Sequence, residues 1–427
     1  MATQLLSVEQ ARELEVRAAK VFQPRTPIAA REFFAGRWNQ ITTLADAVGQ
    51  PGLHVVIYGE RGVGKTSLAN VVKTLIRVFD EDQEEQKRRP ERCVIKTNAS
   101  SGDTFSSIWL KLFGEILWTD DRPSIGLVAN GKKSVQLTEA LDLPNTLSVD
   151  LVRRVISRIP GSVFIIDEFD RAAKAASREF TDLIKALSDF ALDCTVVLVG
   201  VSSTVDELVS DHASITRTLV QILLPRMEAG ELKQILSKAE ETLSVVFDDD
   251  AANLIVRISQ GLPHYTHLLG LHTVRIAAKG LSSRIQRSAV FGALKESVTQ
   301  AQQSVTEKHL KATHSAHKDA LYRQVLLACA LTAARNHDAL GYFTPGAVVD
   351  PLSNVLGRSA EISTFSNHLS EFCKADRGGV LERTGQARAY RFRFSDPLLV
   401  PFIFMDAVNT GLIDDQKLAG LLDGELS

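Results

Sequence analysis

A glycine-rich segment with a lysine and a threonine, residues 59–67, is the stretch of this sequence best suited to chemistry. Its glycines allow a tight turn in which backbone N–H groups approach phosphate oxygens without an intervening Cβ. Lys65 would add positive charge at the β- and γ-phosphates of a nucleotide, and Thr66 would place a hydroxyl on Mg²⁺. The spacing is the G-x-x-x-x-G-K-[ST] pattern of a P-loop. The residues expected to bind nucleotide here are Gly59, Glu60, Arg61, Gly62, Val63, Gly64, Lys65, Thr66 and Ser67.

Two acids supply the second half of the expected site. Asp167 and Glu168 follow the apolar run 163–166, so they emerge where a buried strand ends. In open α/β sheets this edge is where ligands bind. We expect Asp167 to hold Mg²⁺ together with Thr66, and Glu168 to polarise the water that attacks the γ-phosphate. The two motifs together predict ATP or ADP and Mg²⁺ as cofactors.

The elements that must position these residues alternate between strands and helices. A helix from residue 65 to about residue 78 would point its positive N-terminal end at the phosphates. Apolar runs predict a parallel sheet covered by helices on both faces. The expected strands are 54–58, 93–98, 162–170 (an apolar strand ending in acids), 194–201 and 219–224. Further helices are expected at 104–118, 149–159 and 179–190.

After residue 228 the pattern becomes helical, with helices expected at 229–243, 249–259, 264–278 and 288–305. Further on, helices at 320–334 and 363–374 precede two short runs, 378–383 and 389–394, and the second run alternates at period two. These runs predict a hairpin, and helices followed by a hairpin suggest a winged helix. The predicted fold is an α/β P-loop NTPase sheet with a helical lid, followed by an α+β winged-helix domain. The expected parts are an N-terminal helical segment (1–30), the α/β ATPase domain (31–227), the lid (228–306), the winged helix (307–412) and a tail (413–427).

The composition describes a globular chain without a dominant charge. The 427 residues carry a net charge of −2, which excludes a global basic field for nucleic acid. The four cysteines are widely separated, and we interpret them as buried thiols in a reducing cytosol rather than as a disulfide framework or zinc site. The sequence shows neither an apolar signal core nor a run long enough to cross a bilayer. We therefore expect a cytoplasmic protein without a membrane partner.

On these motifs the chain resembles the AAA+ and STAND branch of P-loop ATPases, especially its replication-initiator-like members, over roughly residues 31–410. Phe34 and Arg37, in FAGR, resemble the segment that lies near the adenine in that family. Ser203 follows the strand 194–201 as a polar sensor of the γ-phosphate would. Pro263 and His264, in GLPH, resemble the G-x-P with which the lid of STAND proteins meets the nucleotide. The terminal RFRFSDPLL resembles the winged-helix end of prokaryotic STAND-like ATPases.

The resemblance also implies a subunit that assembles with copies of itself. Arg217 lies where such proteins carry an arginine finger for a neighbouring subunit, and Arg226 competes for that role. The arginine often found in the AAA+ lid is missing at His264, which argues against strong lid-driven hydrolysis. Because the sequence contains no recognisable effector motif, we expect a separate effector or partner protein.

These inferences favour a slow, regulated ATPase that acts as a molecular switch. Its nucleotide state would control oligomerisation and engagement of a partner protein or DNA, in a bacterial defence or signalling system. Two alternatives stay open: a DNA-binding AAA+ ATPase of the replication-initiator or transposition-regulator type, and a non-hydrolysing module that holds ADP. Arginines such as Arg383 and Arg391 on the expected hairpin fit DNA contact through the winged helix and a solvated surface equally well.

Overall fold

The chain forms two compact units, which are described separately. The computed structural model describes residues 5–24, 36–71, 92–120, 133–172, 174–202, 205, 208–209, 215–315, 317, 320–335, 341–386 and 389–423. The sheet unit comprises Pro27–Glu60 and Gly64–Pro225. The helical unit comprises Met1–Thr26, Arg61–Val63 and Arg226–Ser427.

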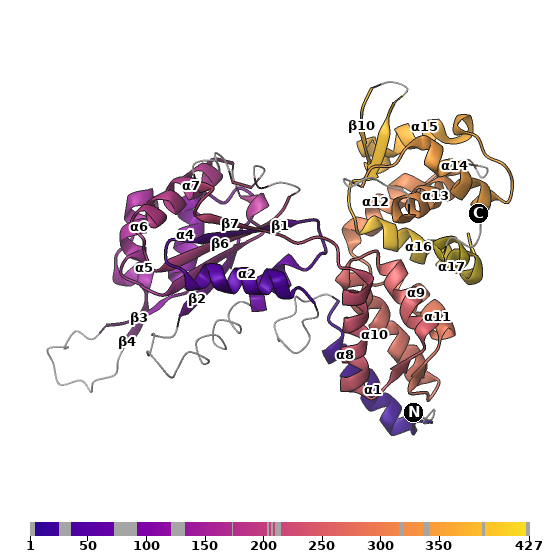
Figure 1. Ribbon diagram of the computed structural model, residues 1–427, viewed down its shortest axis with the longest axis horizontal. Helices are drawn as coiled ribbons and strands as arrows, with labels where there is room; N and C mark the ends of the chain where they lie inside the picture. Colours follow the sequence, from indigo (N-terminus) through magenta and orange to yellow (C-terminus); the bar gives the residue numbers. More distant parts are fainter. Residues whose placement is uncertain are drawn as a thin grey trace. The chain divides into compact units, whose positions relative to one another are not determined.

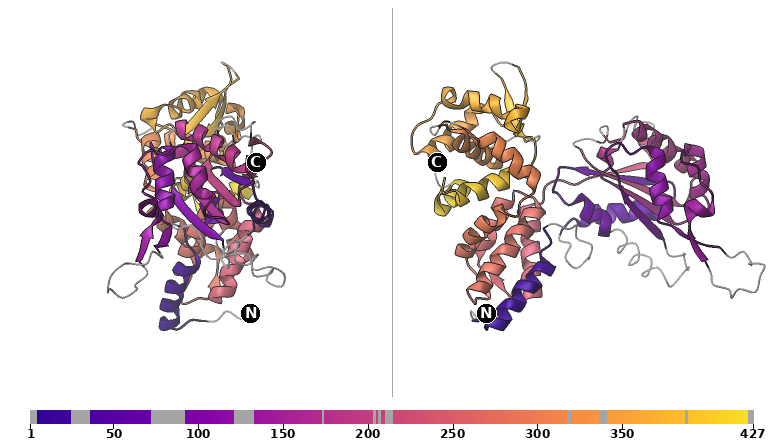
Figure 2. Two further views of the ribbon diagram at one scale, coloured as in Figure 1. Left: turned by 90° about the vertical axis from the view of Figure 1, so that its left-hand side faces the viewer. Right: turned by 180° about the vertical axis from the view of Figure 1, so that it is seen from behind.

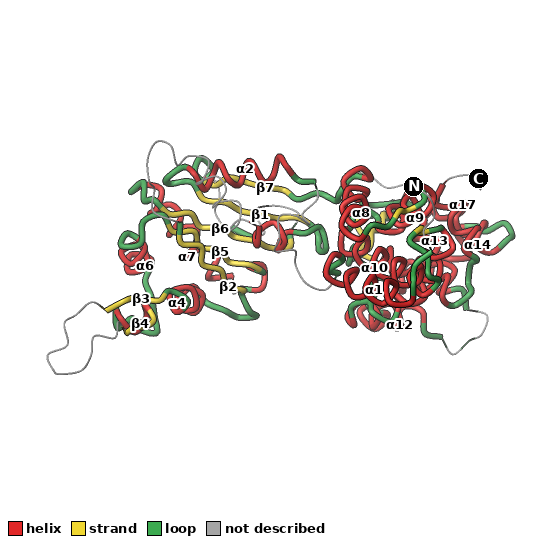
Figure 3. Tube along the Cα trace, turned by 90° about the horizontal axis from the view of Figure 1, so that it is seen from below, coloured by secondary structure: helices red, strands yellow, loops and turns green. Residues whose placement is uncertain are grey.

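The sheet unit is built on five parallel strands. They are β1 (His54–Gly59), β2 (Cys93–Asn98), β5 (Ser162–Asp167), β6 (Cys194–Val201) and β7 (Leu219–Leu223). Their order across the sheet is β2-β5-β6-β1-β7, which Figure 3 shows in projection. All four pairings are parallel, so every strand ends at the same edge. The three central strands β1, β5 and β6 agree closely with apolar runs of the sequence, because a strand buried on both faces is largely apolar. The edge strands β2 and β7 are only partly buried.

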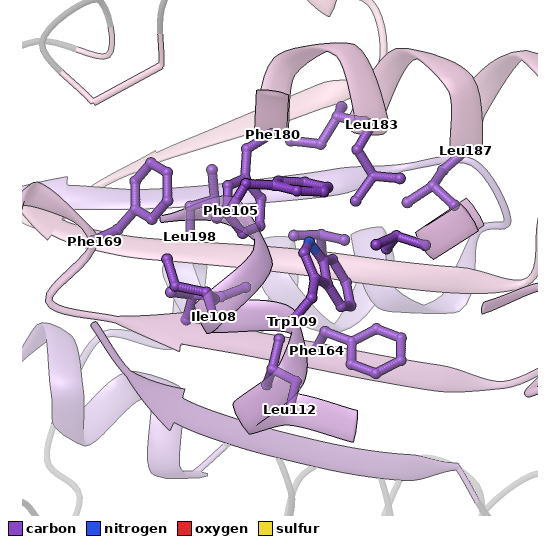
Figure 4. Packing of buried hydrophobic residues seen from close by; sticks show 14 of the residues in the cluster. Phe105, Ile108, Trp109, Leu112, Phe164, Phe169, Phe180, Leu183, Leu187 and Leu198 are labelled. Carbon is purple, nitrogen blue, oxygen red and sulfur yellow. The ribbon is translucent and has the colours of Figure 1, made fainter. Parts of the chain in front are cut away.

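Helices cover both faces of this sheet. On one face α4 (Phe105–Gly114) and α6 (Val149–Ile156) both pack against α7 (Lys174–Asp189). On the other face α2 (Trp38–Gly49) contacts β1, β6 and β7 (Figure 1). The first face carries an aromatic core in which the Trp109 and Phe180 rings stack at 5.9 Å and Phe164 meets Trp109 edge-on at 5.0 Å (Figure 4). Such ring pairs stabilise a core beyond their burial alone.

One predicted helix is shorter in the structure. The helix expected at 104–118 ends at Gly114, and residues Leu117–Asp120 form strand β3 instead. This strand pairs antiparallel with β4 (Lys133–Gln136), which leads into the short helix α5 (Leu137–Ala140). Tertiary pairing has overridden local helical periodicity here.

The helical unit begins with the first helix of the chain, α1 (Val8–Val21). Ser7 and Gln10 cap it with a reciprocal capping box. The helix packs against α8 (Ala229–Leu243) and α10 (Pro263–Lys279), as Figure 2 shows from two further sides. Just after α1, Phe22 lies so close to Gly270 in α10 that a Cβ at Gly270 would overlap the ring. The N-terminal segment is therefore part of the helical unit's core.

The remaining lid elements follow with one difference. Helix α9 (Asp249–Ser259) ends where expected, and the strands β8 (Val246–Phe247) and β9 (Arg284–Ile285) form a small parallel pair. The single helix expected at 288–305 is two helices, α11 (Arg287–Val298) and α12 (Gln303–Thr313). Residues 299–302 separate them. The helical periodicity of the sequence continues across this break, so the sequence predicted one helix where there are two.

The C-terminal part contains the helices and hairpin from which a winged helix was predicted. Helices α13 (Tyr322–Arg335), α14 (Pro345–Leu356) and α15 (Ile362–Phe372) precede the hairpin strands β10 (Leu381–Thr384) and β11 (Arg391–Phe394). Helices α16 (Leu399–Asn409) and α17 (Asp415–Asp423) follow. Helix α16 packs against α11 and α13, which ties this part to the rest of the helical unit. The finer division of the chain into a separate lid and winged helix stays a prediction.

Candidate functional site

The candidate site lies where β1 ends and the glycine-rich loop begins. Gly59 has φ +146°, and a Cβ on it would collide with the carbonyl oxygen of Leu224, at the end of β7. The absence of a side chain therefore lets the chain turn out of the sheet beside the neighbouring strand. A helix starts at Lys65 and is described as far as Val71, so its N-terminal N–H groups are directed towards the loop.

Lys65 is folded back onto this loop. Its side chain is only 8% exposed, and Nζ donates to the carbonyl oxygens of Gly59 at 2.9 Å and Glu60 at 2.7 Å. These contacts hold a positive charge inside the turn where the sequence predicts phosphate. The contacts agree with the predicted role of Lys65 in phosphate binding, which stays a prediction.

Thr66 and Asp167 come together across the sheet edge. Thr66 Oγ1 donates to Asp167 Oδ1 at 3.3 Å, although 101 positions separate the two residues. Because the hydroxyl is the donor in this hydrogen bond, the lone pairs of Thr66 Oγ1 stay available for a cation. One hydroxyl and one buried carboxylate are the kind of oxygen donors with which proteins hold a largely hydrated Mg²⁺ beside phosphates. The residues present therefore fit that metal ion.

Asp167 also has a basic neighbour, Lys96, that sequence reasoning did not single out. Lys96 Nζ on β2 lies 2.9 Å from Asp167 Oδ2 and donates to Asn70 Oδ1 at 2.6 Å. A signal was present in the sequence, since Lys96 is a charged residue within an otherwise mostly apolar strand and such residues need a partner.

Glu168 adopts an unusual backbone conformation at the end of β5. Its φ is +55° and ψ is +34°, a left-handed conformation that non-glycine residues adopt at a cost and that often occurs at functional sites. Its carboxylate accepts from Arg171 Nη1 at 2.7 Å, and both side chains are about half exposed. The acid is thus accessible to solvent, as a group that polarises water has to be.

The turn after Glu168 is fastened to the end of β6. Asp170 Oδ1 accepts from the Val201 N–H at 2.8 Å. Gly200 permits this approach, because a Cβ there would lie 3.1 Å from that oxygen and 2.6 Å from Leu208 Cδ2. The acids are therefore positioned by the adjacent strand as well as by their own.

The structure describes only some of the sheet-unit residues that the family resemblance singled out. Arg37 is 5% exposed and donates to the carbonyl oxygen of Pro225, just after β7, so it lies at the same sheet edge as the loop. Arg217 is exposed in the turn before β7 and so lies at the opposite edge of its own sheet. Phe34 and Ser203 lie outside the described residues.

Other predicted residues belong to the helical unit. Pro263 is the first residue of α10, and His264 Nδ1 lies 2.6 Å from the carbonyl oxygen of Pro24. Arg226 donates to Gln260 O at 3.4 Å. Arg61 Nη1 lies 3.1 Å from Asp396 Oδ2, and its Nη2 donates to Gln302 Oε1 at 2.7 Å. A Cβ at Gly62 would lie 2.9 Å from Leu398 Cδ2.

A profile of the family described as novel STAND NTPase 1 (nSTAND1) matches residues 23–339, which is most of the chain. The protein belongs to this family. The matched region contains Lys65, Thr66, Asp167 and Glu168.

Three solved structures are similar to this nSTAND1 chain, and the first of them shows the same fold. The Walker-type ATPase PABY2304 of Pyrococcus abyssi matches with a TM-score of 0.51 and 16% identity, over 90% of this chain and 99% of that chain. The ORC2 protein of Aeropyrum pernix, in ADPNP–ADP complexes, matches with a TM-score of 0.48 and 14% identity over 95% and 98%. The Thermotoga maritima RuvB branch migration motor matches with a TM-score of 0.42 and 18% identity over 85% and 93%. No match was found among curated proteins.

Several expectations about the remaining surface can be compared with the nSTAND1 structure. Among the described residues, no cluster of three metal-ligating side chains is present, and no helix in the described ranges has the length and apolarity to cross a membrane. The prediction that all four cysteines are buried holds for Cys194 and Cys329. It is wrong for Cys93, which is exposed on the edge strand β2, and Cys373 is only half-buried.

The hairpin arginines are engaged locally where the structure describes them. Arg393 Nε donates to Glu382 Oε2 at 2.8 Å, and the Arg383 guanidinium lies 4.2 Å from the centre of the Tyr390 ring. The ion pair between Arg393 and Glu382 reduces the positive charge that the hairpin presents to a phosphate backbone.

Proposed function

We propose that this nSTAND1 chain binds ATP with Mg²⁺, hydrolyses it slowly, and acts as a nucleotide-dependent switch. The observation that supports this most directly is the convergence of Lys65, Thr66 and Asp167 at one edge of a parallel sheet, with Glu168 beside them. These residues come from the helix that follows β1 and the loop, and from the end of β5, and each has the chemistry that phosphate transfer requires.

Each side chain has a separate task in the proposed reaction. Lys65 contributes positive charge to the β- and γ-phosphates, and Thr66 and Asp167 hold the metal ion. When bound, Mg²⁺ supplies charge neutralisation on the phosphate oxygens. Glu168 orients the attacking water and accepts its proton as the bond from the γ-phosphorus to the bridging oxygen breaks. The exposed position of Glu168 supports contact with water.

The switch part of the proposal concerns assembly and partners. Nucleotide state would control association with further copies of the chain and with a separate effector protein. The ion pair between Arg61 of the loop and Asp396 supports the switch. Through this pair, a change in the conformation of the phosphate-binding loop would alter the segment just before α16. DNA engagement of the replication-initiator or transposition-regulator type and a non-hydrolysing, ADP-holding role remain rival outcomes of the same experiments.

The central test is nucleotide binding by the Lys65→Ala variant. We expect calorimetry to show ATP binding by the wild-type chain and none by Lys65→Ala, because the charge inside the loop is lost. The Lys111→Ala variant is a matched control, since Lys111, on α4, pairs with Asp103 just before that helix and has no part in the loop. Equal ATP affinity in all three proteins would overturn the proposal.

Hydrodynamic size separates the switch from its rivals. We expect the protein to change size between ADP and a non-hydrolysable ATP analogue without DNA. A change that appears only with DNA would favour the DNA-binding alternative, and tight ADP binding with neither turnover nor a size change would favour the structural module.

A further inference from the structure

Lys96 is a basic residue of the nucleotide site that the P-loop pattern does not require. It lies on β2 directly opposite Ile165 of β5, in parallel register. Because side chains alternate along a strand, Ile165 and Asp167 share a face, and a long side chain can reach the diagonal neighbour. This register brings Lys96 Nζ to 2.9 Å from Asp167 Oδ2.

The pair is well enclosed. The Asp167 side chain is 4% exposed and that of Lys96 is 26% exposed. Asn70, on the helix after the P-loop, accepts from the same ammonium at 2.6 Å. Lys96 is therefore held in place by the helix that follows the loop as well as by the carboxylate.

Asp167 is fully engaged by groups of its own chain. Oδ1 accepts from Thr66 Oγ1 at 3.3 Å and from the Glu168 N–H at 2.9 Å. Oδ2 faces the Lys96 ammonium. The negative charge expected to attract the metal ion is thus already paired with a cation from the protein. A metal ion that binds Asp167 must therefore compete with the Lys96 ammonium for the same carboxylate oxygen.

We propose that Lys96 is a resident counter-ion of Asp167, and that it makes nucleotide binding by this chain only weakly dependent on Mg²⁺. The inference rests on the proposed nucleotide site. Without such a cation, a buried Asp167 would repel the phosphates of a metal-free nucleotide. With Lys96 beside it, that repulsion is cancelled, and Mg²⁺ gains less by binding than at an unpaired carboxylate.

The test compares nucleotide affinity with and without the metal ion. A non-hydrolysable ATP analogue is titrated into wild-type protein and Lys96→Met, in excess Mg²⁺ and in EDTA. We expect the wild-type affinities to differ by less than about tenfold, and the Lys96→Met affinities to differ by at least about tenfold more than those of wild type. The affinity of Lys96→Met should be reduced mainly in EDTA, since in excess Mg²⁺ the metal ion replaces the missing positive charge.

Matched variants separate charge from packing. Lys96→Arg keeps the charge and should retain the weak dependence on Mg²⁺. Lys111→Met removes another lysine–aspartate pair, outside the site, and should behave as wild type. If Lys96→Met fails to fold, Lys96→Gln removes the charge while keeping a hydrogen-bond donor and is expected to show the same increase.

A second readout needs no nucleotide. We expect the melting temperature of Lys96→Met to be lower than that of wild type in EDTA and to recover when Mg²⁺ alone is added, whereas wild type changes little. If wild type binds no nucleotide in either condition, the proposed function fails, and the melting experiment still tests the pairing.

Three results would overturn the inference itself. These are strong Mg²⁺ dependence of nucleotide affinity in wild type, equal weakening of Lys96→Met with and without Mg²⁺, and no difference between Lys96→Met and wild type in either assay.

Discussion

At Glu168, the chemical role of the carboxylate can be tested separately from its ion pair with Arg171. We expect Glu168→Gln to keep ATP bound and to reduce turnover by roughly 10²- to 10⁴-fold, because the amide can no longer take a proton from water. Steady-state phosphate release and analogue binding measure the two quantities.

Arg171→Ala serves as the control for Glu168→Gln. It removes the ion-pair partner of Glu168 and leaves the carboxylate. Both side chains are about half exposed, and exposed pairs contribute about 0–1 kcal/mol, so turnover should change by no more than about fivefold. If Arg171→Ala reproduces the full loss of Glu168→Gln, Glu168 acts through the ion pair rather than on water.

Two buried histidines predict how stability responds to acid. Burial lowers the pKa of His54 to about 3 and that of His267 to about 4. Both values are below the unfolded value of 6.5, so the unfolded chain binds more protons below that pH. The stabilising contribution of neutral histidine is therefore complete above about pH 6.5 and is lost as the pH falls towards the folded values.

The expected loss is up to about 1.4 kcal/mol per pH unit for each histidine. Urea unfolding at several pH values from neutral to mildly acidic measures it. In His267→Leu the unfolding free energy of the helical unit should fall less steeply with acid. An unchanged slope in His267→Leu would show that this residue does not carry the effect.

Among the elements, the contact between α10 and the segment after α1 gives a test of packing. A Cβ at Gly270 would overlap the Phe22 ring, so we expect Gly270→Ala to destabilise the helical unit by about 1–3 kcal/mol. In most helix interiors the same substitution is favourable. Urea denaturation provides the measurement.

Two further variants check the cause of this destabilisation. Gly230, on α8, has no atom within 4 Å of an added Cβ, so Gly230→Ala should leave stability unchanged or raise it. The Gly270→Ala/Phe22→Leu double variant should recover part of the loss, because the smaller side chain can move aside. A stabilised Gly270→Ala protein would contradict the packing seen here.

The elements also show how far sequence reasoning reaches. The strands of the sheet were predictable, because β1, β5 and β6 are apolar runs, and the loop and acids carry a recognisable spacing. The break between α11 and α12 and the strand β3 were not predictable, because helical periodicity continues through residues 299–302 and through the start of β3, which pairs with β4. Lys96 could have been suspected from its place in β2, but its partner follows from the register with β5, which no local pattern encodes.

At the scale of the whole molecule, Arg217 predicts assembly. It is exposed before β7, at the edge of the sheet opposite its own P-loop, so it is suited to act on a neighbouring subunit. We expect specific ATPase activity to rise with protein concentration. In Arg217→Ala, turnover should fall, by up to roughly 10³- to 10⁵-fold for a full arginine finger, without weaker ATP binding.

Mixing variants tests whether the arginine acts between subunits. Arg217→Ala mixed with Glu168→Gln should regain activity, because one interface then combines an intact Glu168 with an intact Arg217. Constant specific activity down to the monomer, together with full activity of Arg217→Ala, would exclude this role and point to a self-contained switch.

The strand order β2-β5-β6-β1-β7 also has a consequence for the time course of synthesis. Both neighbours of β1 lie more than 130 residues downstream of it, so the phosphate-binding loop has no completed sheet until β7 has been made. Helix α1 lacks its packing partner for longer still, because α10 is complete only at Lys279. At about 5–20 residues per second, the apolar face of α1 stays uncovered for roughly 10–50 s. During that interval the nascent chain is exposed to chaperones and proteases.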